Sequence, residues 1–523
     1  MEWHAVNFFI SWTPILLITI LAAGLKRQAL ELAFWGCLYT LVLVLFWFKT
    51  PPSVVFLSGV DGLVTNLPLL LVIYSGMMLS GFLLETGSLK RIVEWFSNLT
   101  RNQWHNILLI TVGFGNFMEG AGIVAEPVIA PMLRAAGLPA TGSAALSIAG
   151  YSGLMILELG GAILSVLGFV TGLDLELLSR DVALLSLPAT TFMVLSIPWL
   201  LGQKEQMRIH FLLLVSVGML AGGGALVAVH YIGASVAGLF GGLLVLMGLA
   251  LLGARLGSFH GRLTHDRLTD REAAVPPIVR WNFDRRLLHD MLPLIFLTGC
   301  LFSLNLIAPV KSAAIKVWPG LITIIAGHDI HFRPLFSAYT YIFLSYVVAL
   351  ILAGDRNLAW RNFWATNRRA WKPVLAMALF GMAGQIIAYS GYQLDFGAMD
   401  GSRNIPFILA NGVTQMSGRF YPLFAPFLGW VGTFLTGYGT ASIVLFGKLH
   451  VTTAHLLGVS SSLLVSGMAV GSAIGSISSP MKIALAASMC GAVGREGEIL
   501  RRTIPLGIGV SLALGILLMF LLS

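Results

Sequence analysis

Apolar runs of about twenty residues recur from one end of this chain to the other, and they constrain its fold more than any other feature. A helix needs about 20 such residues to cross the hydrocarbon core of a bilayer. Hydrophobic residues make up 57% of the chain and charged residues only 11%, whereas a soluble domain carries about 25% charged residues. The pattern predicts an all-α polytopic membrane protein with about 12–14 hydrophobic segments. Full-length spans are expected at 8–24, 29–48, 62–84, 182–201, 209–230, 233–254, 291–309, 335–353, 372–392 and 503–522.

The basic residues predict which side of the membrane each loop faces. A net charge of +9 would suit nucleic acid, but in a membrane protein lysine and arginine collect in cytoplasmic loops and set the orientation. We therefore expect no nucleic-acid partner. With the N-terminus outside, 22 of the 32 lysine and arginine residues fall in inside loops. The longest polar segment, 255–290, is then a basic cytoplasmic loop between two halves, 1–254 and 291–523.

Two apolar regions, at about 104–172 and 421–494, are interrupted by glycine, proline and charged residues. They predict broken or re-entrant helices, which are tolerated at membrane depth only where protein shields them. The regions also resemble each other: "NFMEGAG" at 116–122 parallels "TFLTGYG" at 433–439, and "AAGLPATGSAALSIAG" at 135–150 parallels "LLGVSSSLLVSGMAVG" at 456–471. The charge pattern gives the copies opposite directions. We therefore predict inverted repeats at 104–190 and 421–505, an arrangement typical of transporters with a site at the membrane midplane.

Three glutamates lie in these apolar regions, namely Glu119, Glu126 and Glu158. A charge at the bilayer centre costs about 2.5–3.5 kcal/mol, so acids kept there usually have a function. A carboxyl group in a medium of low dielectric can change protonation near neutral pH. We therefore interpret the three as proton-coupling residues, with Glu119 as the principal one. The competing interpretation is that they are polar helix-end residues or members of structural ion pairs.

Lys482, in "SISSPMKIALAAS", is the only basic residue deep in its apolar run. It is expected either to face an anionic substrate or to form a structural ion pair with one of the acids. Exposed N–H groups at the starts of half-helices would also suit a carboxylate, although small residues in membrane helices more often serve packing. The candidate substrate-binding residues are Gly120, Gly122, Thr436, Gly437, Gly439, Thr440, Ser442, Ser478, Ser479 and Lys482.

Catalysis and metal binding are not indicated by the sequence. The histidines and cysteines show no ligand spacing, so no metal, cofactor or catalytic residue is expected. A membrane-embedded enzyme remains a minor alternative, because the loops offer arginine without acidic or histidine motifs. A cation/proton antiporter is the other alternative, and the positive charge of Lys482 counts against a cation site. The favoured interpretation is a secondary carrier for a small organic anion.

Several segments resemble the L-lactate permease family of bacterial secondary transporters. They are "GFGNFMEGAGIVAEPVIA", "VTGLD", "PFLGWVGTFLTG" and "SSPMKIALAASMCGAVGREGEILRRT". The resemblance implies an ion-transporter-type fold with re-entrant hairpins in the bacterial inner membrane, with a periplasmic N-terminus. It implies proton-driven symport of 2-hydroxy monocarboxylates such as lactate or glycolate, and it is compatible with a homodimer.

The chain departs from the family pattern at several polar positions. Glu126 stands where the family has alanine, Lys482 where it has serine, and Ser476 where it has a lysine. The family's Asn-Thr-Ala-Pro becomes the run at 151–154, and its Ser-Asp-Thr-Ser-Ser-Asn becomes the run at 438–443. We therefore expect a divergent member, with two added charges in the region of the predicted site.

Overall fold

A computed structural model describes residues 5–21, 25, 27–97, 102–256 and 285–523 of the chain. It is almost entirely helical, which confirms the predicted all-α polytopic fold. Within the described ranges, nine helical segments are long and apolar enough to cross a membrane. Most of the basic loop predicted at 255–290, namely 257–284, lies outside the described residues.

One layer of the molecule, which we call the scaffold, is built around the longest helices, α3 (Pro52–Glu85) and α18 (Arg356–Ala388). These two pack along each other, and a Cβ on Gly62 would lie 2.3 Å from the carbonyl oxygen of Gly381. Small residues allow membrane helices to approach this closely. Both helices are longer than the predicted spans at 62–84 and 372–392, because apolar runs mark only the part of a helix that lies in hydrocarbon. The other scaffold helices are α2 (Ala29–Val42, continued by η2, Leu43–Trp47), α15 (Arg285–Leu306) and α17 (Ala338–Ala353).

A β-hairpin beside the scaffold was not predicted from the sequence. Strands β1 (Gly320–Ile325) and β2 (His328–Phe332) pair antiparallel and lie along α3, after the short helix α16 (Ala308–Lys316). Its signal is the β-branched run in "GLITII" and the short alternation in "HDIHF" on either side of an Ala-Gly turn, in which Gly327 has a φ of 79°. This period-2 pattern is only a few residues long, and apolar helices surround it in the sequence.

The first repeat begins with a helical hairpin. Its first arm is α5 (Gln103–Leu108), η3 (Leu109–Phe114) and α6 (Gly115–Gly120), and its second arm is α7 (Glu126–Ala135). A broken helix follows, α8 (Ala140–Ser152) and α9 (Ala162–Thr171), and then the long helix α10 (Leu175–Leu195). Two short turns, η4 (Met155–Leu157) and η5 (Leu159–Gly161), occupy the break. Three consecutive residues there, Leu159 to Gly161, have positive φ angles of 52°, 62° and 76°, which a helix cannot contain.

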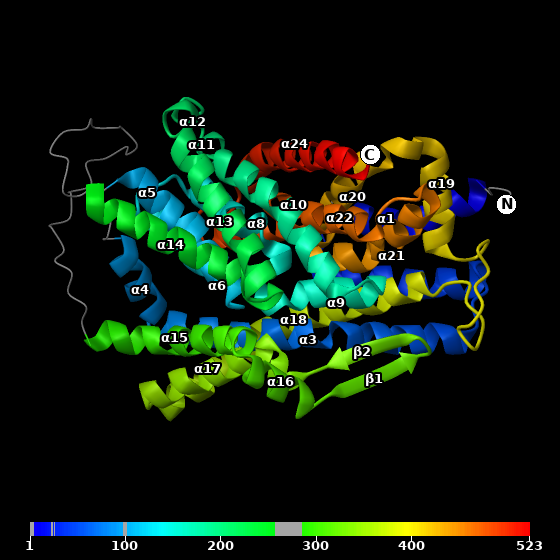
Figure 1. Cartoon of the computed structure of the whole chain (residues 1–523), viewed down its shortest axis with the longest axis horizontal. Coiled ribbons are helices and arrows are strands. Elements are labelled where there is room, and N and C mark those ends of the chain that lie inside the picture. Colours follow the sequence, from blue (N-terminus) through cyan, green and yellow to red (C-terminus); the bar gives the residue numbers. More distant parts are fainter. Residues whose placement is uncertain (1–4, 22–24, 26, 98–101, 257–284) are drawn as a thin grey trace.

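The second repeat contains the same elements in the same order. Helices α20 (Tyr421–Thr436) and α21 (Gly439–Leu457) form its hairpin and turn at Gly437, whose φ is 81°. Helix α22 (Ser461–Gly475), the turn η9 (Ser476–Ser478) and α23 (Pro480–Cys490) form its broken helix, and α24 (Glu496–Leu522) is its long helix. Figure 1 shows α10 and α24 crossing the molecule in opposite directions. The predicted inverted repeats with broken and re-entrant helices are therefore confirmed.

A matching pair of glycines holds each hairpin against its broken helix. A Cβ on Gly150 of α8 would lie 1.9 Å from the carbonyl oxygen of Thr111, and a Cβ on Gly471 of α22 would lie 1.9 Å from that of Pro426. Gly150 and Gly471 end the two aligned stretches 135–150 and 456–471. The same close approach of backbone to backbone is therefore repeated in both halves, and only glycine permits it.

Several helices that carry lysine or arginine have their basic ends on one side of the molecule. Arg91 of α4 (Ser88–Ser97) bonds Asp290 of α15 at 2.5 Å, and Arg361 of α18 pairs with Glu85 at the end of α3. Figure 1 shows α4, α5 and the start of α15 at one end, and α1 (Ala5–Thr19) with the end of α24 at the other. The remaining helices are α11 (Ile197–Leu200), α12 (Gln206–Ile209), α13 (Phe211–Tyr231), α14 (Ala237–Leu256) and α19 (Ile405–Ser417), with 3-10 turns at Ala234–Val236, Pro334–Phe336 and Gly418–Phe420.

The paired glycines give a testable prediction. We expect Gly150→Ala and Gly471→Ala each to destabilise the folded protein by about 1–3 kcal/mol, because the methyl group would overlap a backbone oxygen that cannot move freely. Thermal unfolding of the purified protein in detergent measures the effect. The control is Gly223→Ala in α13, where a Cβ would meet nothing within 4 Å. If the alanine variants melt together with the control, the close approach does not contribute to stability.

Candidate functional site

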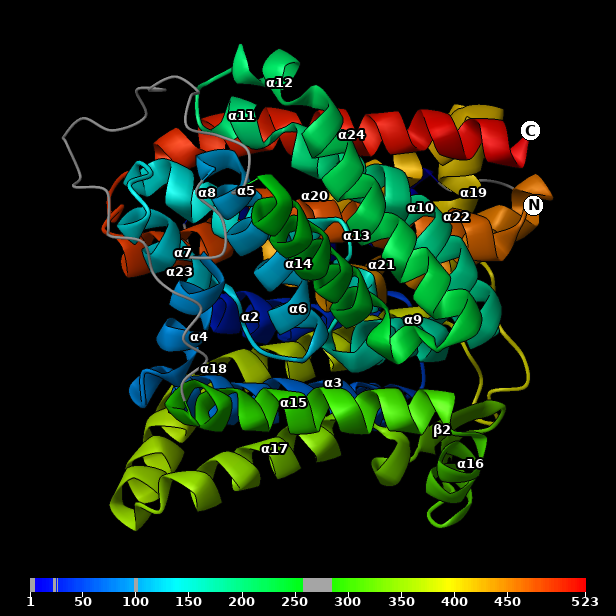
Figure 2. The same cartoon turned by 60° about the vertical axis from the view of Figure 1, so that its left-hand side comes forward.

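Three ionisable side chains meet where the two broken helices approach each other. Lys482 of α23 donates from Nζ to the hydroxyl of Tyr151 of α8 at 2.8 Å, and this hydroxyl donates to Oε1 of Glu126 of α7 at 2.5 Å. The lysine Nζ also lies 3.4 Å from Glu126 Oε1 and 4.9 Å from the centre of the tyrosine ring. Figure 2 shows α7, α8 and α23 side by side. The hairpin of one repeat and the broken helices of both thus supply one cluster.

Local sequence places the two charges at helix starts. Glu126 is the first residue of α7 and precedes Pro127, and an acid in the first turn interacts favourably with the positive end of the helix dipole. Lys482 follows Ser479, whose side chain caps α23, and Pro480. Glu126 is 2% exposed, and the Lys482 side chain is 18% exposed. Because both are largely withdrawn from solvent, each charge depends on the other.

Glu119 closes the turn of the first hairpin. It lies at the end of α6, is 6% exposed, and its Oε1 accepts the backbone N–H of Ala125 at 2.7 Å. This bond ties the end of the first arm to the start of α7. Glu119 is close enough to Glu126 and Lys482 to interact with both charges. The structure therefore brings the principal predicted acid to the edge of the cluster.

Glu158 occupies the break between α8 and α9. Its side chain is completely buried, and neither carboxylate oxygen has a hydrogen-bond partner in the part of the chain that the structure describes. Gly238 of α14 leaves it room, since a Cβ there would lie 2.8 Å from Glu158 Cγ. An unpaired buried charge is costly, so the location favours a neutral carboxylic acid. Glu158 also interacts with the charges of Glu119, Glu126 and Lys482.

The predicted glycines of the first hairpin pack closely against other helices. A Cβ on Gly120 would lie 2.2 Å from the backbone nitrogen of Leu239, and a Cβ on Gly122 would lie 2.5 Å from Ile342 Cδ1. The N–H of Gly122 donates to the carbonyl of Glu119. These two glycines therefore fix the position of the turn, and the Gly122 N–H is already engaged.

The turn of the second hairpin touches the cluster. A Cβ on Gly437 would lie 2.1 Å from Met481 Cε, and a Cβ on Gly439 would lie 2.5 Å from Met155 Cε. Met155 Sδ is 4.0 Å from Lys482 Nζ. The predicted hydroxyls nearby are all buried. Three of them donate to backbone carbonyl groups: Thr436 to Gly432, Ser442 to Gly429 and Ser478 to Thr503. Ser479 caps α23, and Thr440 lies in the first turn of α21.

Sequence reasoning missed the residue that links the two charges, Tyr151. The only signal was its place in the run 151–154, where the family pattern is polar. Met155, and Tyr438 at the turn between α20 and α21, were missed as well, because apolar and aromatic residues in a membrane span carry no signal of their own. The hydroxyls of Ser152 and Ser476, 3.1 Å apart, join the two breaks directly.

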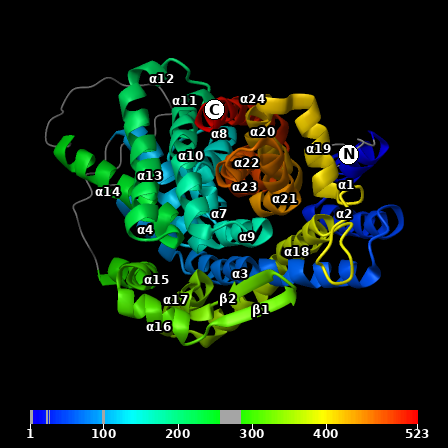
Figure 3. The same ribbon diagram turned by 45° about the vertical axis from the view of Figure 1, so that its right-hand side comes forward.

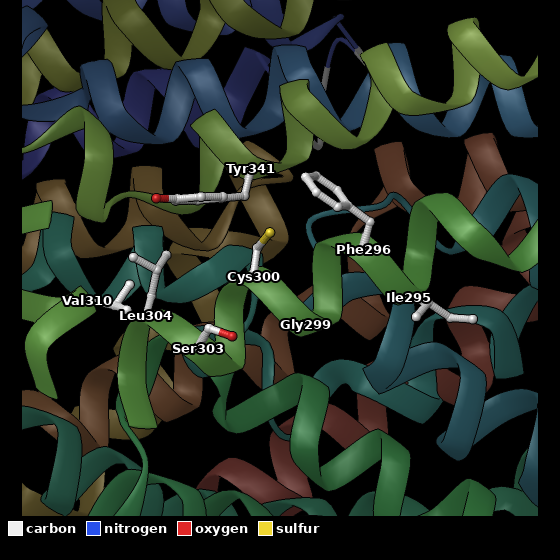
Figure 4. A pocket seen from close by; sticks show the side chains of 8 residues that line it. All are labelled: Ile295, Phe296, Gly299, Cys300, Ser303, Leu304, Val310 and Tyr341. Atoms are coloured by element: carbon white, nitrogen blue, oxygen red, sulfur yellow. The ribbon is translucent and has the colours of Figure 1, made fainter. Parts of the chain in front are cut away.

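A separate groove lies among α15, α16 and α17 and has a volume of about 320 Å³ (Figure 4). Its lining is mostly apolar, with Cys300, Ser303 and Tyr341 as the polar members and no charged side chain. None of the cluster residues contributes to it. A site for an organic anion needs a compensating charge or donors, so the cluster between the broken helices is the better candidate.

Comparison with known proteins identifies the family of this chain. The model of the L-lactate permease family matches residues 7–523. The chain belongs to the L-lactate permease family. It is 24% identical to the glycolate permease GlcA of Escherichia coli K12, over 98% of this chain and 95% of that protein, and 26% identical to the L-lactate permease of Salmonella typhimurium, over 95% and 93%. The YdaH transporter of Alcanivorax borkumensis superimposes with a TM-score of 0.49 at 15% identity, over 94% of this chain and 98% of that structure.

Membership of this permease family makes the chain a multi-pass membrane transport protein and not an enzyme. This L-lactate permease family member carries two charged residues that the family pattern lacks, and the structure places them in contact. Glu126 and Lys482 lie in different repeats, 356 positions apart in the sequence by their numbers, yet they form one ion pair. Each added charge therefore compensates the other.

The pairing predicts a compensating double substitution. Glu126→Ala or Lys482→Ser alone leaves a largely buried charge without its counterion, and we expect each to lower the free energy of unfolding by about 3 kcal/mol. The two together restore the family's residues, and we expect the double variant to regain most of that loss in thermal unfolding. The control is the exposed pair Arg495–Glu498, where Glu498→Ala should cause no measurable change. Additive losses in the double variant would contradict the pairing.

Proposed function

We propose that this chain is a proton-coupled symporter of a small 2-hydroxy monocarboxylate, of the lactate or glycolate type. The permeases that it resembles are named for these two anions. The observation that carries the proposal is the chain of contacts from Lys482 through Tyr151 to Glu126, buried between the two repeats. It offers one cation, one hydroxyl donor and one acid that can exchange a proton.

The substrate and Glu126 would compete for the same lysine. Without substrate, the carboxylate of Glu126 neutralises Lys482. An incoming substrate carboxylate takes that place, and Glu126 is then left in a medium of low dielectric without a counterion, so it binds a proton. One proton accordingly enters with one anion, and the cluster carries the same net charge before and after binding.

Glu119 and Glu158 would extend the proton route. Glu119 is slightly exposed and Glu158 fully buried, and both interact with the charge of Lys482. We therefore assign to Glu119 the exchange of the proton between solvent and cluster, and to Glu158 the storage of a proton at the break of the first helix. Gly120, Gly122, Gly437 and Gly439 hold the turns in place around them.

The walls of the cluster favour a small substrate. Met155 and Met481 touch the turn of the second hairpin, and Tyr438 at that turn interacts with the charge of Glu126. The first turn of α21 follows this turn directly, and it contains Thr440, Ser442 and the first N–H groups of the helix. A 2-hydroxy acid of two or three carbons offers one carboxylate for Lys482 and one hydroxyl for Tyr151, and it leaves little apolar surface to accommodate.

The gathering of basic helix ends supports the predicted orientation. We propose that this side faces the cytoplasm of a bacterial cell and that α1 begins on the periplasmic side, as the positive-inside rule requires. We retain the division into halves at 1–254 and 291–523 as part of this proposal, together with assembly as a homodimer.

Uptake into proteoliposomes tests the coupling. With an imposed pH gradient, acidic outside, we expect the wild type to accumulate lactate or glycolate. Glu119→Gln should reduce this accumulation by at least about tenfold. The same variant should still exchange substrate when its concentration is equal on both sides. Glu205→Gln, at an exposed acid, is the matched control. Accumulation driven by sodium instead of the pH gradient would replace the proton as the coupling ion, and full activity of Glu119→Gln would remove Glu119 from the mechanism.

Substrate affinity as a function of pH tests the competition at Lys482. In the wild type we expect affinity to fall by up to about tenfold per pH unit on the alkaline side, because binding requires a proton on Glu126. Glu126→Gln is permanently neutral and should bind with an affinity that no longer depends on this group. Lys482→Met should not bind at any pH. Intrinsic tryptophan fluorescence or calorimetry gives the affinities, and an unchanged pH profile in Glu126→Gln would rule out the exchange.

A further inference from the structure

A second buried polar cluster lies apart from the three glutamates, where the scaffold meets the repeats. Its members are Asp61 of α3, His328 of β2 and Gln385 of α18, and the charge of Lys448 of α21 acts on both Asp61 and His328. Asp61 is fully buried and accepts the side-chain N–H of Gln385 at 2.9 Å. The hairpin that carries His328 lies along α3 (Figures 1 and 3). The proposed transport mechanism uses none of these residues.

The bonds of His328 fix the number of protons in the cluster. Its Nδ1 lies 2.9 Å from both carboxylate oxygens of Asp61, and its Nε2 lies 2.7 Å from the carbonyl oxygen of Phe169. A carbonyl and an ionised carboxylate can only accept, so both ring nitrogens must carry hydrogen. The alternative is a neutral ring with a protonated Asp61. In either case the pair holds one proton more than a neutral imidazole beside an ionised carboxylate.

The carbonyl of Phe169 belongs to the last turn of α9, where carbonyl groups have no partner within the helix. The negative end of the helix dipole also favours a cation at this position. Helix α9 is the half of the broken helix that starts directly after Glu158 and its turn. His328 therefore connects a hairpin beside the scaffold to the helix that adjoins the break of the first repeat.

The surrounding groups act on His328 in opposite senses. Burial lowers the pKa of the His328 imidazole, and so does the charge of Lys448. The hydrogen bond with Asp61, the negative charge of Asp61 and the hydrogen bond with the Phe169 carbonyl outweigh them, so the pKa lies above its usual value of about 6.5. The ring of Tyr389 of α18 lies 6.4 Å from the imidazole. The described charged and titratable groups that face His328 are thus Asp61, Lys448 and Tyr389.

We propose that Asp61 and His328 form a second proton-binding site, which fastens the hairpin β1–β2 to helix α9 while the proton is bound. When the proton leaves, the ionised carboxylate of Asp61 keeps the hydrogen on Nδ1, so the lone pair of Nε2 faces the carbonyl oxygen of Phe169, and two acceptors in contact repel each other. The contact is fully formed below about pH 6.5 and is lost as the pH rises through the raised value. The position of α9 then depends on pH through a group that is not the coupling acid.

Hydrogen–deuterium exchange of the full chain in lipid nanodiscs tests the proposal without measuring transport. Peptides that cover 320–336 and 162–175 are followed between about pH 5.5 and 8.5, with rates corrected for the intrinsic effect of pH. In the wild type we expect protection of both segments to fall by about fivefold or more as the pH rises through this range. In His328→Gln, which carries no titrating ring, protection should be low at every pH.

His331→Gln is the matched control, because His331 lies on the same strand with its side chain exposed. It should reproduce the wild-type profile. A flat profile in the wild type, or the same pH response in His328→Gln as in the wild type, would overturn the proposal. If His328→Gln fails to fold, the pH dependence of protection in the wild type alone decides whether the proposal stands. Proton-driven uptake through Glu119 is measured separately, so failure of this site and failure of the transport proposal are distinguishable.

Discussion

The close approach of each helical hairpin to its broken helix is the contact on which the rest of the structure depends. Polar backbone groups released at a helix break cannot face lipid, so protein must surround the break. Gly150 and Gly471 let the two backbones come together in the same way in both repeats. With the hairpins held there, the turns at 121–125 and 437–438 and the breaks at 153–161 and 476–479 all lie in the interior, where ionisable groups can be retained.

The interior so formed handles charge in two ways. Glu126 and Lys482 neutralise each other through direct contact and through Tyr151, whereas Glu158 is buried without a hydrogen-bond partner among the described residues. In the proposed mechanism, one substrate anion pairs with Lys482 while one proton binds Glu126, so the site stays electrically balanced during binding. This gives a physical reason why a transporter for a small anion would tolerate two charges that its family pattern lacks.

The Asp61–His328 pair follows the same chemistry at a different place. There, too, a buried carboxylate faces a basic side chain, and in the proposal one proton decides whether the contact between two parts of the fold persists. The cluster of Glu126, Tyr151 and Lys482 joins the two repeats to each other, while the Asp61–His328 pair joins the first repeat to the scaffold. Protons would thus act on the molecule at two separate contacts, one within the transport path and one at its support.

The sequence by itself determined the membrane-spanning fold, the opposite directions of the two repeats and the interrupted regions that hold Glu119, Glu126, Glu158 and Lys482. These follow from apolar length, loop charge and local repetition, which are properties of neighbouring residues. Only the tertiary structure decided that Glu126 pairs with Lys482, that Tyr151 joins them and that a hairpin brings His328 to Asp61. All but the Tyr151–Glu126 bond link residues hundreds of positions apart. A tyrosine or histidine in an apolar or short alternating run also looks the same in the sequence whether it packs, bonds or titrates.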